Sequence, residues 1–471
     1  MDSDICFATA REQARLLRTR AISAVELTRA HLERIEATNP RVNAIVTLVA
    51  DRALDQARAA DARMAAKAPV GPLHGIPMAH KDTHDTAGIR TTSGSVLLAE
   101  NVPVRDELVI ERIRAAGAIT LGKTNVPEFA AGSHTFNELF GATRNPYDLG
   151  KSAGGSSGGA AAALACGMHA LADGSDMGGS LRNPASFCNV VGFRPSPGRV
   201  PSWPTQAPWS TLAVQGPMAR TVGDIALLLS VLAGPDSRSP IAISERGSVF
   251  SGELDRDMRG LRVAWAPDLG GAVPVDPAVR AALEPTVATF TELGADVTLD
   301  CPNLTGAEEV FRTLRAWQFA LALGPLLTQR DRIKKSLVWN IEAGLALRGT
   351  DIAAAELRHA ELFHRMREFF DRYDVLLAPV SQVPPFDIEL EYPAEIAGEP
   401  MHTYLDWMRS AYFISATGCP ALSVPGGFTA TGLPVGLQII GPHRADRRVL
   451  EVGHAFEQAT GFGKIRPTIA R

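Results

Sequence analysis

The stretch that is most informative about the fold covers residues 154–185, which read GGSSGGAAAALACGMHALADGSDMGGSLRNPA. It contains two glycine-flanked serine sites, Ser156-Ser157 and Ser180. Glycines around a serine let several backbone N–H groups converge beside one hydroxyl, and acyl transfer needs such a nucleophile with donors for the oxyanion. The segment GGSSGG alone is more typical of a turn or linker. The alanine run and the charged DMGGSLR that follow favour a catalytic interpretation of the whole stretch.

Composition excludes several classes of protein. The chain has 471 residues, a net charge of −4 and 45% hydrophobic residues, enough for a large core without a basic surface for nucleic acid or membrane. Its five cysteines are scattered and form no C-x-x-C pair, so neither a disulfide framework nor a zinc site is expected. Residues 1–20 lack an apolar signal core, and no run of about 18 apolar residues occurs. These features predict a cytoplasmic protein.

Hydrophobic patterning predicts an α/β fold with helices on the faces of a sheet, in one large domain over residues 1–471. Ser23 with Glu26 three residues later is a typical helix start, and an apolar run over 76–79 leads to Lys81 in an extended segment. Helices are expected within residues 10–68 and over 106–116, 277–293, 307–373 and 444–459. Strands are expected at 118–121, 261–264, 295–299, 374–379, 421–424 and 435–440, with a proline-rich loop at 384–400.

The last helix expected within 307–373 carries an apolar repeat at steps of three or four residues. The residues of this repeat are Leu357, Ala360, Phe363, Met366 and Phe370.

A serine nucleophile needs a base at neutral pH, and Lys81 is the most unusual candidate. None of the 11 histidines stands in a motif that marks it as a base. Lys81 closes an apolar run, and a buried lysine loses its charge easily and can accept a proton. The alternative is that Lys81 simply pairs with an acid such as Asp82. His80 and His84 have the spacing of a helical metal site, but their segment is expected to be extended, so no metal is predicted.

Two further motif matches lack the right context. Residues 154–158 fit the G-x-S-x-G nucleophile elbow, but the preceding RNPYDLGKSA is not a hydrophobic strand. Residues 117–124, GAITLGKT, fit a phosphate loop, but their middle is expected to be a strand. No G-x-G-x-x-G follows a strand, so dinucleotide binding is not expected.

Taken together, these segments resemble the amidase signature family over most of the chain. The matching motifs are GPLHGIP (71–77) with Lys81-Asp82, GKTN (122–125) with Glu128, Asn145-Pro146, 154–159, 176–185, GFRP (192–195), GPMART (216–221) and GLPVGLQ (432–438). The resemblance implies a mixed central β-sheet covered by helices on both faces, with a core motif region at about 71–221. It also implies a helical insertion at about 307–373 that helps to build a substrate funnel.

The resemblance implies a Ser–cis-Ser–Lys triad. Ser180 would be the nucleophile, Ser156 the bridging serine after a cis peptide bond, and Lys81 the base. The backbone N–H groups that would bind the oxyanion belong to Met177, Gly178, Gly179 and Ser180. The supporting residues would be Asp176 and Arg182, which brace the loop, and Ser157, which helps to orient the lysine. Met177 and Ala153 stand where isoleucine and proline are common in the family, which affects pocket shape more than chemistry.

An amidohydrolase without metal or organic cofactor is therefore expected, acting on a small-molecule amide, and a homodimer is compatible with this. Two alternatives stay open. The first is the glutaminase subunit of a tRNA-dependent amidotransferase, which would need partner subunits. The second is a non-catalytic scaffold, but the joint presence of all three triad residues argues against it. Large aromatic side chains recur in two segments; most are expected in the core, but some would line an apolar entrance. Hydrophobic or aryl amides are thus the expected substrates, with carbamates or esters as further options. These aromatic residues are Phe311, Trp317, Phe319, Trp339, Tyr404, Trp407 and Tyr412.

Overall fold

Two β-sheets form the framework of the computed structural model, which describes residues 3–470. The larger sheet has eight strands in the order β10-β9-β11-β15-β14-β7-β8-β6. Its first three strands are parallel, and every later pair of neighbours is antiparallel, so the sheet is mixed. The strands are β6 (Leu171–Asp176), β7 (Val191–Arg194), β8 (Val214–Ala219), β9 (Arg262–Trp265), β10 (Asp296–Leu299), β11 (Val375–Pro379), β14 (Ala421–Phe428) and β15 (Pro434–Ile440).

A second sheet of three strands has the order β1-β3-β2, and two short hairpins complete the strand inventory of residues 3–470. One hairpin lies within 384–400, where the sequence predicts only a loop. The three-stranded sheet consists of β1 (Ile45–Leu48), β2 (Pro77–Lys81) and β3 (Ile119–Thr124). The hairpins are β4 (Arg144–Asn145) with β5 (Asp148–Ser152), and β12 (Glu395–Ile396) with β13 (Glu399–Pro400).

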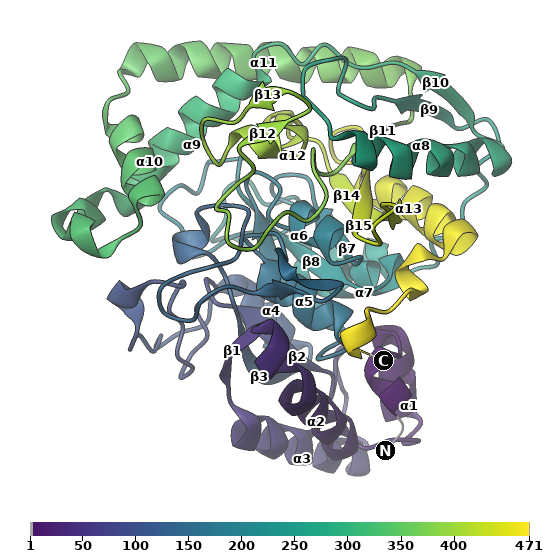
Figure 1. The fold of residues 1–471 in the computed structure, drawn as a ribbon. Helices are drawn as coiled ribbons and strands as arrows, with labels where there is room; N and C mark the ends of the chain where they lie inside the picture. The colour runs from purple at the N-terminus through teal and green to yellow at the C-terminus, as the bar shows by residue number, and fades with distance from the viewer. Residues whose placement is uncertain (1–2, 471) are drawn as a thin grey trace.

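Helices cover both faces of the large sheet, as predicted (Figure 1). Helices α7, α8 and α13 pack together on one face, while α5 and α6 pack on the other. Helices α1–α3 gather near the small sheet, and α9–α11 form a layer at the opposite end of the view. Their bounds are α1 (Ala10–Arg18), α2 (Ala24–Val42), α3 (Ala50–Ala65), α4 (Leu108–Ala115), α5 (Gly158–Ala165), α6 (Arg182–Phe187), α7 (Val222–Leu232), α8 (Pro277–Glu292), α9 (Ala307–Leu323), α10 (Lys335–Leu345), α11 (Gly349–Arg372), α12 (Arg409–Ala416) and α13 (Asp446–Thr460).

Local sequence signals explain how the elements that carry the site begin and end. The predicted start of α2 is confirmed, because the Ser23 hydroxyl accepts the Glu26 N–H while the Glu26 carboxylate accepts the Ser23 N–H. The apolar run before Lys81 becomes β2, which is buried at every position and pairs in parallel with β3.

Within residues 3–470, no helix is both long and apolar enough to cross a membrane.

Helix α11 is present where the sequence predicts a helix. The apolar residues whose spacing indicated it, however, do not form its buried face. Leu357 is 64% exposed and Phe363 is 39% exposed, whereas Met366 is buried. The buried face instead runs through Ala355, Leu362, Met366 and Phe369. Two apolar stripes occur on this helix, and periodicity alone cannot show which one packs inward.

Candidate active site

Lys81, the last residue of β2, is fully buried beside Ser156. Its Nζ lies 2.8 Å from the Ser156 Oγ and 2.9 Å from the Ser175 Oγ. Burial lowers the pKa of Lys81 from 10.5 to about 7, although the charges of Asp176, Asp173 and Glu107 oppose the shift. A substantial fraction of Lys81 is therefore neutral near pH 7 and can accept a proton from Ser156.

Ser156 follows a cis peptide bond from Gly155, as the family resemblance implies. The carbonyl of Gly155 accepts a hydrogen bond of 2.6 Å from the Ser133 hydroxyl. A Cβ atom on Gly155 would lie 3.0 Å from the backbone of both Ser133 and His134, so the close approach of this neighbouring segment requires glycine. Packing and hydrogen bonding thus hold Ser156 against Lys81.

The loop between β6 and α6 is braced by the buried carboxylate of Asp176. It accepts N–H groups of Gly179 at 2.9 Å and Leu181 at 3.2 Å, and its two oxygens bind the Arg182 guanidinium at 2.9 and 3.0 Å. Burial alone would raise the pKa of Asp176, but Arg182 and Arg194 hold it far below its ordinary value. The expected bracing by Asp176 and Arg182 is therefore present in the geometry.

Ser180 lies in this loop, partly exposed, and its hydroxyl makes no hydrogen bond to any residue in the described range 3–470. Its carbonyl accepts the Ser157 N–H at 3.2 Å, which ties the two serine loops together. Among the four predicted oxyanion donors, the N–H of Gly179 is already used by Asp176. The N–H groups of Met177, Gly178 and Ser180 have no acceptor among the described residues and remain the candidates for binding an oxyanion.

Ser157 does not orient the lysine, contrary to expectation. Its hydroxyl is buried and has no hydrogen-bond partner among the described residues, because it points toward Gly174, where a Cβ atom would lie 2.7 Å from it. The hydroxyl that contacts Lys81 besides Ser156 is that of Ser175. Asp173 and Ser175 are two positions apart and lie on the same face of β6, but the sequence LADGSD has too little β propensity to predict this strand.

His80 and His84 flank Lys81, and both histidines bind the carboxylate of Asp173. The Nδ1 atom of His80 lies 2.6 Å from Oδ2 of Asp173, and that of His84 lies 2.9 Å from Oδ1. The same carboxylate accepts the backbone N–H of Lys81 at 2.9 Å. Across residues 3–470 no group of three His, Cys, Asp or Glu side chains is arranged to hold a metal ion.

An apolar wall of side chains packs against the loop between β6 and α6. A Cβ atom on Gly178 would lie 2.8 Å from Cζ of Phe311 and 3.1 Å from Cε of Met408, and Phe311 stacks on Tyr412 with ring centroids 4.2 Å apart. Met177 packs against both apolar clusters of the described residues, the main core and a smaller cluster that consists of Ala131, Phe319, Ile333, Leu337, Val338 and Ile341. Most of the predicted aromatics are core residues: those buried are Phe311, Phe319, Tyr404, Trp407 and Tyr412, whereas Trp317 is partly buried and Trp339 is 40% exposed.

Comparison with known proteins agrees with this geometry. The family model described as Amidase matches residues 26–450. An acylamidase of Rhodococcus erythropolis is 35% identical over 470 residues, which cover 99% of this chain and 98% of that protein. A glutamyl-tRNA(Gln) amidotransferase subunit from Moorella thermoacetica is 37% identical, with 99% of both chains covered. The crystal structure of a bacterial aryl acylamidase of the amidase signature enzymes family matches with a TM-score of 0.91 at 31% identity, covering 98% of each chain.

Proposed function

This chain belongs to the amidase signature family of carbon–nitrogen hydrolases, and we propose that it hydrolyses carboxylic amides through an acyl-enzyme on Ser180. The observation that carries the proposal is the contact of 2.8 Å between Ser156 and a buried lysine whose pKa is lowered to about 7. That pair is a base poised near neutral pH beside a glycine-rich loop with unused N–H donors.

In the first half-reaction, neutral Lys81 takes the proton of Ser156, which in turn takes the proton of Ser180. The Ser180 oxygen attacks the amide carbon, and the N–H groups of Met177, Gly178 and Ser180 bind the oxyanion. Ser156 then protonates the leaving nitrogen and recovers its proton from Lys81, so the C–N bond breaks, the amine departs and the lysine is neutral again. In the second half-reaction, water gives a proton to the same relay and attacks the ester, and the relay returns that proton to the Ser180 oxygen as the acid is released.

We further propose that the acyl group is hydrophobic or aromatic, with aryl carbamates and esters as additional substrates. Support comes from the wall of Phe311 and Met408 against Gly178, and from Met177, which packs against both apolar clusters. Apolar walls favour ligands of matching apolar area. A small-molecule substrate and a cytoplasmic location belong to the same proposal.

A series of amides with one leaving amine and acyl groups from acetyl to hexanoyl and phenylacetyl tests the acyl preference. We expect kcat/KM to rise with the apolar area of the acyl group. A preference for acetyl over phenylacetyl would contradict the apolar wall while leaving the triad intact.

A second candidate function is the glutaminase component of a tRNA-dependent amidotransferase, because amidotransferase subunits of this kind are 35–37% identical to this chain over 96–99% of it. Such a protein would need partners and a path for ammonia. Assays of the purified chain distinguish the two functions. Hydrolysis of apolar amides supports the amidohydrolase proposal. Release of ammonia from glutamine but from no other small amide supports the glutaminase.

A further inference from the structure

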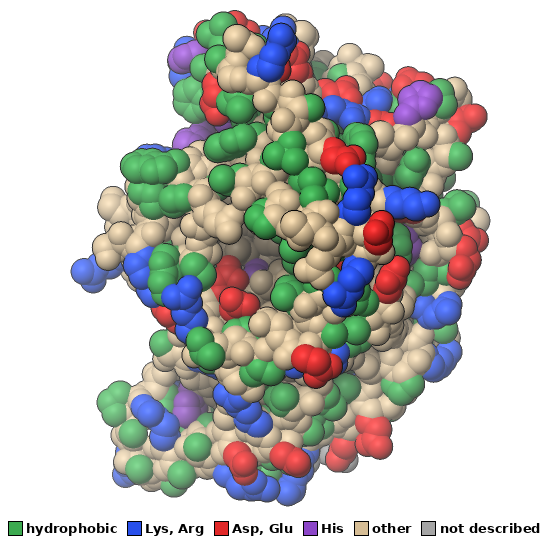
Figure 2. Space-filling model, turned by 90° about the vertical axis from the view of Figure 1, so that its left-hand side faces the viewer, with side chains coloured by type: hydrophobic (Ala, Val, Ile, Leu, Met, Phe, Trp, Pro, Cys, Tyr) green, Lys and Arg blue, Asp and Glu red, His purple; other side chains and the backbone are tan. Residues whose placement is uncertain are grey.

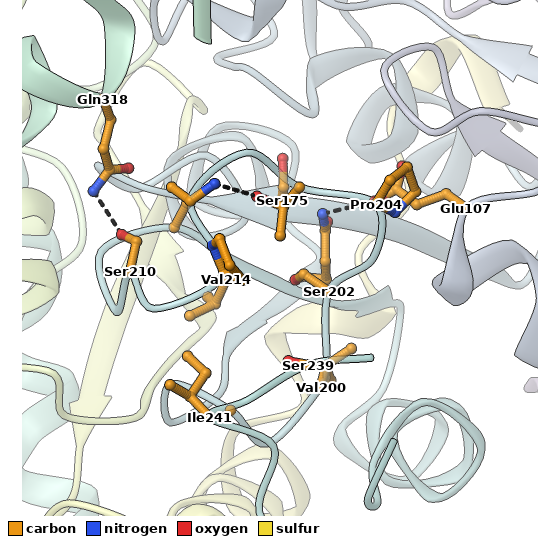
Figure 3. A pocket seen from close by; sticks show the side chains of 16 residues that line it. Glu107, Ser175, Val200, Ser202, Pro204, Ser210, Val214, Ser239, Ile241 and Gln318 are labelled. Atoms are coloured by element: carbon orange, nitrogen blue, oxygen red, sulfur yellow. Dashed lines mark hydrogen bonds between the residues drawn. The ribbon is translucent and has the colours of Figure 1, made fainter. Parts of the chain in front are cut away.

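A cavity of about 180 Å³ opens beside the catalytic base (Figure 3). Its wall includes Ser175, whose hydroxyl lies 2.9 Å from the Nζ of Lys81, which also contacts Ser156. The cavity therefore borders the lysine side of the triad. It is smaller than the roughly 300–1,000 Å³ of sites for drug-sized ligands, so its occupant is small.

The molecule is also visibly hollowed on one face, where acidic and histidine side chains can be seen inside the opening (Figure 2).

The cavity wall is mixed: apolar side chains such as Val200, Val214 and Ile241 alternate with polar ones, and the single ionisable side chain is Glu107, which immediately precedes α4. In Figure 3, Gln318 of α9 donates to Ser210 across one end of the cavity, a hydrogen bond of 2.6 Å. The other hydroxyl and amide side chains of the wall are those of Ser175, Ser202, Thr205, Gln215 and Ser239. Such a wall suits a ligand group that is polar and positively charged.

Glu107 is held in place by a chain of hydrogen bonds that runs from the partly buried Gln215 to the buried His84 and Asp173. The Gln215 amide donates to Oε1 of Glu107 at 3.0 Å, and the Gln215 Oε1 lies 2.8 Å from Nε2 of His84. His84 is fixed in turn by its Nδ1 contact of 2.9 Å with Asp173. The second carboxylate oxygen of Glu107 makes no hydrogen bond to any residue between 3 and 470. The chain of bonds thus orients one carboxylate oxygen and leaves the other for a ligand.

The direction of proton transfer shows which half of an amide would enter this cavity. In the proposed mechanism, Ser156 and Lys81 return a proton to the leaving nitrogen, so the leaving amine must lie on their side of the scissile bond. The acyl half then faces the opposite, apolar wall beside Gly178. We propose, resting on the amidohydrolase function above, that the cavity binds the leaving amine and that Glu107 recognises a cationic group, an ammonium or guanidinium, at its far end.

Electrostatics around Glu107 are consistent with this role. Burial raises the pKa of Glu107, and the nearby charges of Asp85 and Asp173 raise it further, while His84 and Lys123 lower it. A cation at the unoccupied oxygen would relieve this burial penalty, because an opposite charge within a few ångströms favours the carboxylate form. A neutral leaving group of the same size would gain nothing from the carboxylate.

The test uses two amides of phenylacetic acid that differ only at the end of the leaving amine: the N-propyl amide and the N-(2-aminoethyl) amide. We expect the wild-type protein to favour the aminoethyl amide at least tenfold in kcat/KM. Glu107→Gln should reduce this ratio to within about twofold of unity, with folding checked by circular dichroism. The matched control is Glu111→Gln, one turn along α4, where the carboxylate pairs with Arg238 outside the cavity, and it should keep the preference.

Competition between each amide and a fluorophosphonate probe for Ser180 measures binding even where the amide is hydrolysed slowly. The aminoethyl amide should slow the labelling of Ser180 by a fluorophosphonate at a concentration at least tenfold below that of the propyl amide. Equal potency of the two amides in the wild-type protein, or a preference that survives Glu107→Gln, would overturn the assignment of Glu107. Absence of both hydrolysis and labelling of Ser180 would instead overturn the amidohydrolase function.

Discussion

The pH dependence of catalysis follows directly from the burial of Lys81. Only the neutral lysine can take a proton, so activity is lost as the pH falls through the pKa of Lys81 in the folded protein. With that pKa at about 7, the neutral fraction rises from about one tenth at pH 6 to about nine tenths at pH 8. We therefore expect kcat/KM for an uncharged amide to rise about tenfold between these values and to level off above pH 8.

The measurement is kcat/KM from pH 5.5 to 10 in buffers of constant ionic strength, with circular dichroism at each pH to confirm that the protein stays folded. An unshifted lysine, with a pKa of 10.5, would instead give about a hundredfold rise from pH 6 to 8 that continues to pH 10. That profile would refute the burial argument. Activity that falls steadily from pH 6 to 9 would refute the lysine base itself.

Three substitutions test other parts of the site. Ser156→Ala removes the middle of the relay and should lower kcat by about 10²–10⁴-fold, measured against Ser152→Ala as a control outside the relay; near-normal turnover would exclude the relay. Gly178→Ala places a methyl group 2.8 Å from Phe311 and should raise KM for apolar amides, with a stability loss of about 1–3 kcal/mol measured by urea unfolding; an unchanged KM would mean that substrate does not pass this wall. Arg182→Met leaves Asp176 with less charge compensation in the core and should cost about 3–5 kcal/mol of unfolding free energy; a loss below about 1 kcal/mol would show that Arg194 alone is enough.

Local patterns and motifs in the sequence predicted the main features of the fold. The apolar run before Lys81 predicted a buried, extended segment that ends at this residue, and β2 has that form. The cis peptide before Ser156 followed from the family resemblance and is present. These predictions succeed because each depends on neighbours in sequence or on a long, specific motif.

Features that depend on distant partners could not be predicted in the same way. Strand β6, which leads into the loop that contains Ser180, reads Leu-Ala-Asp-Gly-Ser-Asp, a composition with little β propensity. Its buried Asp173 is tolerated because His80 and His84, more than 80 positions earlier, bind the carboxylate. Without β6, the position of Ser175 beside Lys81 could not be found, and Ser157 was the residue assigned to that role.

The chain of hydrogen bonds that positions Glu107 could not be anticipated from the sequence either. Glu107, Gln215 and His84 lie on three separate segments, and only the fold brings them into one chain of hydrogen bonds. No spacing rule relates such residues along the sequence.

The central claim is that Ser180 forms the acyl-enzyme, and mass spectrometry of the trapped protein tests it most directly. Wild-type protein treated with a fluorophosphonate should gain one adduct, and peptide mapping should place it on Ser180. Ser180→Ala should gain none, and prior incubation with phenylacetyl amides should slow the wild-type reaction. An adduct on Ser156 or Ser157, or full amide hydrolysis by the folded Ser180→Ala variant, would contradict the account.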